Sequence, residues 1–460
     1  MAEILPDDNV SDNSTDGRRY LLITLGCFRN EVEADLLRSA LSARGMAETG
    51  AVESADLIAV MTCGFIREAC DEGIDTILAL DELASRRPRR PPIMVLGCMS
   101  QRYGAALMSE MPEIDAALGG DWQAELADAL AALLGDEKYR GTGGPPRMCT
   151  LERSTDSSGG ATLYVRAADG CDRACRFCTI PSIRGPFTSR PPEEVTAEIE
   201  RLCGGRQREV VLLAQDLTSY GCGLQPGEAG LSQLAANITR LDCVHWLRLL
   251  YLQPEGVSER LIEEVAGNGR ICDYFDIPFQ HASRDVLRAM GRPGSAEEYL
   301  DLLARIRTAV PRAALRSTVM VGYPGENARD FEVLLDFVRA ARFDWLGAFI
   351  FSPEEGTPAA ELGGAVETDE ALSRYNMVVE VQDGIEAERL ESMLGLELEV
   401  VVDDICEIEP YDLVGRSYRE APVVDGSIYL KRSRSCTVQP GEFARARITG
   451  HEGLDLVGEI

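Results

Sequence analysis

The sequence has too few basic residues to balance its acids. Its 46 Lys and Arg stand against 76 Asp and Glu, a formal net charge of −30 at pH 7. A field of that sign repels nucleic-acid phosphates and favours basic partners. No run of eighteen apolar residues occurs, so no membrane span is expected. The N-terminus lacks the basic start and apolar stretch of a signal peptide, which predicts a cytoplasmic protein whose residues 1–18 form a disordered tail.

One cysteine motif is a ligand short of a structural metal site. Cys171, Cys175 and Cys178 form the pattern C-x-x-x-C-x-x-C, and no fourth cysteine follows at a similar spacing. A structural zinc site takes four protein ligands and remains the alternative interpretation. Fourteen cysteines in a reducing compartment indicate metal or redox chemistry rather than disulfides. Three thiolates can hold an iron–sulfur cluster and leave its fourth iron open to a substrate or cofactor.

Residues 19–140 read as a parallel α/β domain. Three short apolar runs alternate with amphipathic stretches, and the runs end at Cys27, Cys63 and Cys98. Ligands of such sheets bind beyond the carboxyl ends of the strands, so these cysteines are expected to converge there. Taken singly, each would more often be a small buried apolar residue. A segment rich in Gly, Pro and Ser, residues 141–160, is predicted to be a linker.

Residues 161–391 continue the alternation through six βα units, which predicts an open, partial (β/α)6 barrel. Active sites of such barrels lie at the carboxyl ends of the strands. Gln280, Arg316 and Glu326 are candidate cofactor contacts by that argument, and His281 is either a proton-transfer group or a structural histidine. The stretch around Glu326 is also consistent with a simple strand-to-helix turn.

Residues 392–460 change to short alternating segments separated by Gly and Pro turns, which predicts a small all-β barrel or sandwich. Between Glu391 and Ile460 there are fourteen acidic and seven Lys or Arg residues, a net charge of −7. The fold class is therefore α/β, with a parallel N-terminal domain, a partial barrel and a C-terminal β domain.

These motifs together resemble a known family. C-x-x-x-C-x-x-C after the first barrel strand, with Phe177 before the last cysteine, resembles the radical S-adenosylmethionine superfamily. The three strand-end cysteines and the β domain, which is then TRAM-like, resemble its methylthiotransferases. "LLAQDLTSYG", "DIPFQHAS", "MGRPGS" and "GRSYREAPVVDG" are similar to the RimO branch. Two departures lie beside the N-terminal cysteines, namely Arg29 where Lys is usual and Met61 where Asn is usual.

The resemblance implies two 4Fe-4S clusters and two molecules of S-adenosylmethionine per reaction. Cys171, Cys175 and Cys178 would hold the cluster that cleaves S-adenosylmethionine, with Phe177 beside it. The second cluster, on the three N-terminal cysteines, would carry the sulfur to be inserted. A reducing donor such as flavodoxin or ferredoxin would supply electrons. The implied reaction is methylthiolation at the β-carbon of an aspartate of small-subunit ribosomal protein uS12.

Two alternatives remain, one a sister activity and one of a different class of function. A sister activity methylthiolates an adenosine of transfer RNA, and an iron–sulfur protein can also be a plain electron carrier. A domain that holds transfer RNA should present a basic face, whereas this C-terminal domain is acidic. A carrier needs no large barrel with polar strand ends. The sequence therefore favours uS12 as partner and makes direct binding of nucleic acid unlikely.

Overall fold

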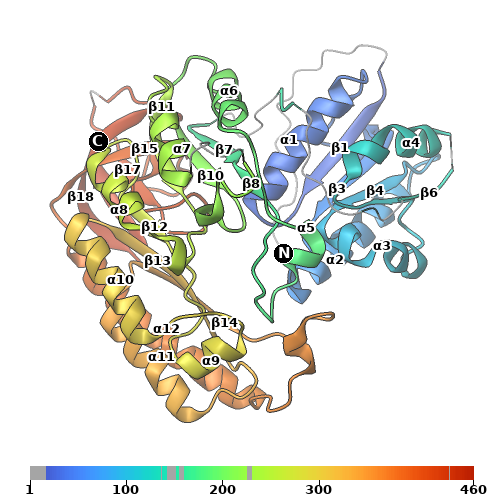
Figure 1. Cartoon of the computed structure of the whole chain (residues 1–460). Helices are drawn as coiled ribbons and strands as arrows, with labels where there is room; N and C mark the ends of the chain where they lie inside the picture. The colour runs from blue at the N-terminus through green and yellow to red at the C-terminus, as the bar shows by residue number, and fades with distance from the viewer. Residues whose placement is uncertain are drawn as a thin grey trace. The chain divides into compact units, whose positions relative to one another are not determined.

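The computed structural model describes residues 17–135, 137–141, 144, 152–154, 160–224, 230–434 and 436–460. Most of the predicted tail and most of the predicted linker lie outside these ranges. The chain divides into two compact units (Figure 1). The first unit comprises residues 1–157, 169–173 and 178–188, and the second comprises 158–168, 174–177 and 189–460. The chain crosses between them near the short strands β8 (Ala168–Asp169) and β9 (Thr188–Ser189).

The first unit has a parallel sheet with the strand order β2-β1-β3-β4-β5-β6. Its strands are β1 (Arg19–Thr24), β2 (Ala47–Glu48), β3 (Leu57–Thr62), β4 (Ile93–Gly97), β5 (Ala116–Leu118) and β6 (Tyr139–Arg140). Its helices are α1 (Phe28–Ser42), η1 (Val52–Ser54), α2 (Arg67–Ala84), α3 (Cys98–Glu110), α4 (Trp122–Leu134) and α5 (Ile180–Arg184). The direction of strand addition reverses between β1 and β3, and ligands of such sheets bind at that reversal.

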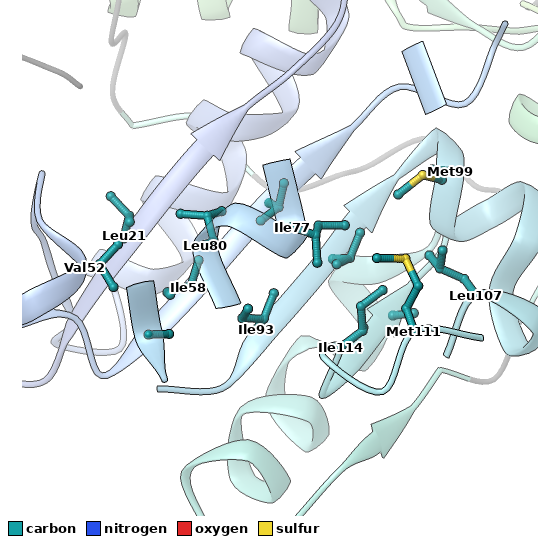
Figure 2. Close-up of a cluster of buried hydrophobic side chains, with 14 of the residues drawn as sticks. Leu21, Val52, Ile58, Ile77, Leu80, Ile93, Met99, Leu107, Met111 and Ile114 are labelled. Atoms are coloured by element: carbon teal, nitrogen blue, oxygen red, sulfur yellow. The ribbon is translucent and has the colours of Figure 1, made fainter. Parts of the chain in front are cut away.

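The central strands of this sheet are buried at every position, as parallel strands covered on both faces are. Leu21, Ile58 and Ile93 come from neighbouring strands and belong to one buried cluster with Ile77 of α2 and Leu107 of α3 (Figure 2). These contacts remove a continuous apolar face from water, which fixes the register of each strand. The loops at the carboxyl ends of β1, β3 and β4 are thereby held by a rigid core.

The second unit carries six parallel strands. β7 (Thr162–Arg166), β10 (Arg208–Leu213) and β11 (Val244–Leu249) form one sheet, and β12 (Tyr274–Asp276), β13 (Ala314–Val321) and β14 (Trp345–Ile350) form another. A parallel bridge between Leu247 and Ile271 joins the two sheets. The order is β7-β10-β11-β12-β13-β14, which confirms the predicted open barrel with β7 and β14 as its edges.

Helices follow the barrel strands in sequence. They are α6 (Pro192–Cys203), η2 (Leu217–Ser219), α7 (Leu231–Ile238), η3 (Pro254–Gly256), α8 (Glu259–Gly267), α9 (Arg284–Ala289), α10 (Ala296–Ala309), α11 (Ala328–Ala341), η4 (Pro358–Glu361) and α12 (Thr368–Glu391). Helix α6 begins with a proline and ends before a left-handed Gly204, as the sequence predicts. Asn327 caps α11 and forms a capping box with Asp330. No helix among the described residues is long and apolar enough to cross a membrane.

The C-terminal strands form a closed barrel in the order β15-β16-β17-β19-β18, as predicted for an all-β domain. They are β15 (Glu397–Ile405), β16 (Leu413–Arg416), β17 (Ile428–Lys431), β18 (Phe443–Glu452) and β19 (Asp455–Glu459). Inward residues such as Val400, Leu430 and Ile448 fill its core. Closure pairs the strand edges that would otherwise be open.

One segment of this domain, residues 416–425, touches every strand of the partial barrel. Arg416 donates to Thr162 of β7 and to Glu209 of β10 at 2.9 and 2.8 Å. Arg248 of β11 donates to the carbonyl oxygens of Ser417 and Tyr418 at 3.1 and 2.8 Å. The remaining three strands are reached near their first residues.

On β12, the hydroxyl of Tyr274 donates to Asp425 at 2.6 Å. The guanidinium of Arg316, on β13, lies 3.2 Å from the same carboxylate. The indole of Trp345, on β14, donates to the carbonyl oxygen of Arg419 at 2.8 Å. The β domain is therefore fixed to the barrel by buried polar contacts. In five of the six strands these contacts use one of the first three residues, away from the carboxyl ends.

Candidate functional site

The first unit sets three cysteines at the carboxyl ends of adjacent strands. Cys27 precedes α1 and follows the turn after β1, and Cys63 follows β3 directly. Cys98 is the first residue of α3, directly after β4. Cys27 and Cys63 flank the reversal in strand order, where ligands of such sheets bind. Two of the three stand at helix N-termini, whose partial positive charge favours thiolates and other anions.

Two glycines show how closely the cysteine loops approach one another. A Cβ at Gly26 would lie 2.7 Å from the Cβ of Cys63, and Gly26 has a φ of +95°. A Cβ at Gly64 would lie 2.7 Å from the carbonyl carbon of Cys98. Real Cβ atoms do not approach that closely, so a larger residue at either position would push the loops apart. The loop before Cys27 thus packs on Cys63, and the loop after Cys63 packs on Cys98.

The thiol chemistry of this set fits a cationic metal group. Burial raises the pKa of Cys63 to about 11, although a hydrogen bond from the backbone of Phe65 lowers it, and neighbouring Cys98 and Cys27 raise it further. Thiols that hinder each other's ionisation become thiolates together only when a cation compensates the charge, and metal binding then releases their protons. The burial of Cys63 and its two neighbouring thiols therefore suit a cationic metal group bound by all three sulfurs.

A buried arginine binds the sulfur of one of these cysteines. Arg184, the last residue of α5, donates through Nη2 to Sγ of Cys98 at 3.1 Å. Its Nη1 donates to Oε1 of Glu33 at 3.0 Å, and Oε2 of Glu33 accepts from the indole of Trp122 at 2.8 Å. Burial works to lower the pKa of Arg184, but Cys98 and Glu33 outweigh it and raise that pKa well above its usual value. The guanidinium is therefore charged, and it is held between the sulfur of Cys98 and the carboxylate of Glu33.

A second buried arginine, Arg29, connects the segment after Cys27 to the segment before Cys171. Arg29 stands two residues after Cys27, and it donates to Asp169, two residues before Cys171, at 2.7 Å. The same carboxylate accepts from the backbone of Gly170 at 2.7 Å. In the first unit, the start of the C-x-x-x-C-x-x-C loop is thus tied to the segment that begins at Cys27.

In the second unit, Cys175 also has an arginine at its sulfur. Arg292 is buried, and its Nη1 lies 3.6 Å from Sγ of Cys175. Its Nη2 donates at 2.9 Å to Oε1 of Gln253 and to the carbonyl oxygen of Pro278, both at carboxyl ends of barrel strands. Arginine can present several donors in a fixed fork, which is why one side chain holds the cysteine and two strand ends together.

The remaining loop residues of this unit are anchored by the backbone and by packing. The backbone of Arg176 donates to Met290 at 2.9 Å, and its carbonyl oxygen accepts from Ala359 at 2.9 Å. Phe177 packs against the apolar cluster that contains Met290 and Tyr323. Its role beside the cofactor stays a prediction, but contacts with this apolar cluster fix the position of its ring.

Two of the predicted cofactor contacts lie at the carboxyl ends of β12 and β13. Gln280 has a φ of +70°, unusual for a non-glycine residue, and is held by backbone hydrogen bonds to Thr318 and Met320 at 2.8 and 2.7 Å. Glu326 is buried, accepts from the backbone of Tyr323 at 3.1 Å and is ion-paired with Arg374 at 2.8 Å. Burial raises the pKa of Glu326 although Arg374 works to lower it.

His281 lies beside this pair and is completely buried. Its Nδ1 accepts from the backbone of Ser283 at 2.9 Å, so the proton of the neutral ring is on Nε2. Among the residues that the structure describes, that Nε2 has no hydrogen-bond partner, and it lies 3.9 Å from Oε2 of Glu326. Burial lowers the pKa of His281 to about 3, and nearby Arg374 contributes to this while Asp330 opposes it. The ring is neutral at physiological pH.

Arg316 is placed differently from the other predicted contacts. It is the third residue of β13, near the start of the strand, and its guanidinium pairs with Asp276 and Asp425 at 3.1 and 3.2 Å. Its predicted cofactor contact stays a prediction, while its described partners belong to the attachment of the β domain.

Sequence reasoning missed the two arginines that contact cysteine sulfurs. Both arginines lie in or near segments that the sequence analysis had singled out. Arg184 lies six residues after Cys178, and Arg292 lies in "MGRPGS". Spacing alone does not show which sulfur each one reaches. In the parts of the chain that the structure describes, no three His, Cys, Asp or Glu side chains are placed to hold a single metal ion. Thiolates of an iron–sulfur cluster each bind a different iron, so they need not meet at one point.

Comparisons with known proteins cover most of the chain. Residues 165–338 match the model of the radical SAM superfamily, residues 19–119 that of the uncharacterized protein family UPF0004, and residues 394–460 that of the TRAM domain. Ribosomal protein uS12 methylthiotransferase RimO of Geobacter sulfurreducens is 38% identical over 95% of this chain and 98% of its own length. Its counterpart in Pelotomaculum thermopropionicum is 39% identical over 96% of this chain and 99% of its own.

A solved structure shares the fold at low identity. The radical S-adenosylmethionine methyltransferase TsrM from Kitasatospora setae, with cobalamin and a 4Fe-4S cluster bound, superposes with a TM-score of 0.55 at 15% identity. The likeness covers 93% of this chain and 84% of that one, and it concerns the fold alone.

Proposed function

Because this chain belongs to the family of ribosomal protein uS12 methylthiotransferases named RimO, we propose that it attaches a methylthio group to uS12 by radical S-adenosylmethionine chemistry. The observation that carries this proposal is that the likeness to those relatives runs through the α/β domain, the partial barrel and the β domain alike. The proposed position of attachment is the β-carbon of one aspartate. That carbon bears no leaving group and its hydrogens, beside a carboxylate, are only very weakly acidic, so acid–base catalysis by side chains cannot place a nucleophilic sulfur there.

The radical SAM family implies a 4Fe-4S cluster and S-adenosylmethionine, and we assign them to the loop of Cys171, Cys175 and Cys178. Bound there, they supply the one-electron chemistry that an unactivated C–H bond requires. Arg292 orients Cys175 from the strand ends, and Phe177 closes the apolar side of the loop. Gln280 and Glu326 are assigned to orient S-adenosylmethionine, because both follow the carboxyl ends of barrel strands, where the active sites of such barrels lie.

A second 4Fe-4S cluster is assigned to Cys27, Cys63 and Cys98. Its role is to present the sulfur that is inserted. The close approach of the three loops, the mutual effect of the thiols on the pKa of Cys63, and the arginine at Cys98 support this assignment. A reducing partner such as flavodoxin or ferredoxin is proposed as the source of electrons.

For uS12 we propose a docking surface on the β domain, here called the acidic patch and defined by Asp404, Glu407 and Glu409. All three are exposed, and Ile405 and Ile408 between them are 63% and 54% exposed. An exposed apolar pair bordered by acids suits a basic protein that lines ribosomal RNA. The neighbouring Asp403 is not part of the patch, because it is ion-paired with Arg416 at 2.7 Å.

The decisive experiment is anaerobic turnover with two substrates. The reconstituted and reduced protein is given S-adenosylmethionine with either uS12 or unmodified transfer RNA, and both are examined by mass spectrometry. The proposal expects one methylthio group on an aspartate of uS12 and unchanged transfer RNA. Methylthiolated adenosine with unmodified uS12 would assign the sister activity instead.

A further inference from the structure

Arg184 is the residue of the first unit best placed to act on a group held by the three strand-end cysteines. Its guanidinium is buried, and it divides its hydrogen bonds between the sulfur of Cys98 at 3.1 Å and the carboxylate of Glu33 at 3.0 Å. A donor aimed at a cysteine sulfur is unusual because a neutral thiol is a weak acceptor, whereas a metal-bound thiolate is a strong one.

The surroundings hold Arg184 in that position from several directions. Glu33 is itself fixed by the indole of Trp122 at 2.8 Å. At the start of the same short segment, the hydroxyl of Thr179 donates to the carbonyl oxygen of Phe65, two residues after Cys63, at 3.3 Å. The segment 179–184, which begins directly after Cys178, is thus attached to two of the three strand-end loops. Such outer contacts orient the ligands of metal sites and tune the metal.

We infer that Arg184 is the positioning residue of the second cluster, and that it holds the Cys98 sulfur in place and raises the reduction potential of a cluster bound there. This inference rests on the proposed assignment of that cluster. A reduced cluster carries one more negative charge than an oxidised one. A cationic donor on a ligand sulfur therefore stabilises the reduced form more, which moves the potential upward.

The chain offers a matched control in Arg292, which makes the corresponding contact with Cys175 in the other cysteine set. If contact with a sulfur is what matters, each arginine should affect its own cluster only. A merely structural role for Arg184 would lower stability or iron content without a selective shift in one potential.

The test is a redox titration followed by electron paramagnetic resonance, without uS12. In protein whose Cys171, Cys175 and Cys178 are alanine, only the second cluster contributes. R184Q should then lower the midpoint so that the ratio of reduced to oxidised cluster changes by at least tenfold, about 59 mV for a one-electron couple. R292Q in the same background should leave that midpoint unchanged. With Cys27, Cys63 and Cys98 replaced instead, R292Q should shift the midpoint and R184Q should not.

R184Q leaves Glu33 as a buried carboxylate without its cation, which can weaken folding. E33Q/R184Q removes both charges and is titrated as well. The midpoint potential of this double variant should still lie below that of the parent protein, because the hydrogen bond from the guanidinium to the sulfur is lost. An unchanged midpoint in a fully iron-loaded R184Q or double variant would overturn the inference and leave the assignment of uS12 intact. Four irons rather than eight in the unsubstituted protein would overturn the second cluster itself.

Discussion

The guanidinium of Arg416 lies 2.8 Å from the carboxylate of Glu209, although 207 positions separate them in the chain. Both side chains are buried, and Arg248 approaches the other oxygen of Glu209 at 2.7 Å. Burial alone would raise the pKa of Glu209, but Arg416 and Arg248 outweigh it and lower the pKa to about 2. The carboxylate is therefore ionised at neutral pH, and it joins the β domain to the barrel.

Glu209→Gln should weaken this attachment strongly. The variant leaves two buried guanidinium groups without their shared anion, and breaking such a network costs about 3 to 5 kcal/mol. The free energy of unfolding, measured by anaerobic denaturant titration, should fall by that amount. Glu263→Gln, on the exposed face of α8, is the matched control and should change it by no more than about 0.5 kcal/mol. Equal effects of the two variants would contradict the role given to Glu209.

The two cysteine sets should bind iron independently. We expect about eight irons per chain after anaerobic reconstitution, in two four-iron clusters. Replacement of Cys171, Cys175 and Cys178 by alanine should leave about four irons and no cleavage of S-adenosylmethionine. Iron analysis and the electronic spectrum measure this directly. Complete loss of iron in that variant would show that the other set is not a separate site.

The two sets should also differ in role. Replacement of Cys27, Cys63 and Cys98 by alanine should preserve formation of 5′-deoxyadenosine and abolish sulfur insertion, because the cleaving cluster has its own ligands. Chromatography of the nucleoside and mass spectrometry of uS12 give the two readouts from one reaction. If both activities disappear while the remaining cluster is still present, the division of labour is wrong.

The acidic patch should bind uS12 through opposite charge. Asp404→Lys, Glu407→Lys and Glu409→Lys together should lower affinity at least tenfold without changing 5′-deoxyadenosine formation. Binding to unsubstituted protein should weaken as salt rises, since screening reduces attraction between exposed charges.

A control separates this patch from overall charge. Glu263→Lys, Glu332→Lys and Glu380→Lys make the same change of charge on exposed positions of α8, α11 and α12. Affinity measured by calorimetry should change little in the control. A similar loss in both triple variants would mean that net charge, and not the patch, attracts uS12.

His281 should make the protein sensitive to acid. Its pKa in the folded chain is about 3, below the ordinary value of 6.5, so the folded state binds fewer protons than the unfolded state between these values. Stability is therefore lost as pH falls below 6.5 toward 3. Between pH 7.5 and 5.5 the loss from this one group is about 1.4 kcal/mol. His281→Asn should remove that part of the pH dependence in anaerobic thermal unfolding, and an unchanged dependence would contradict the assignment.

The sequence by itself determined the class of fold and predicted the roles that are proposed for the two cysteine sets. Short apolar runs with helical stretches between them specify parallel strands, because each run can only be buried when helices cover both faces. The place of Cys27, Cys63 and Cys98 at the ends of three such runs follows from that local pattern. The C-x-x-x-C-x-x-C spacing is local as well, so no tertiary information is needed to recognise it.

Only the tertiary structure decided which distant side chains act on these elements. Arg184 reaches Cys98 across 86 positions, and Arg416 reaches Glu209 across 207. Arg316 and Glu326 were both predicted from the sequence to lie at the end of a barrel strand. Arg316 instead lies near the start of β13 and pairs with Asp425 of the β domain. Periodicity states which face of a strand is buried, but not which partner arrives there. That partner is set by long-range packing, where a buried charge must find its counter-charge or hydrogen-bond acceptor.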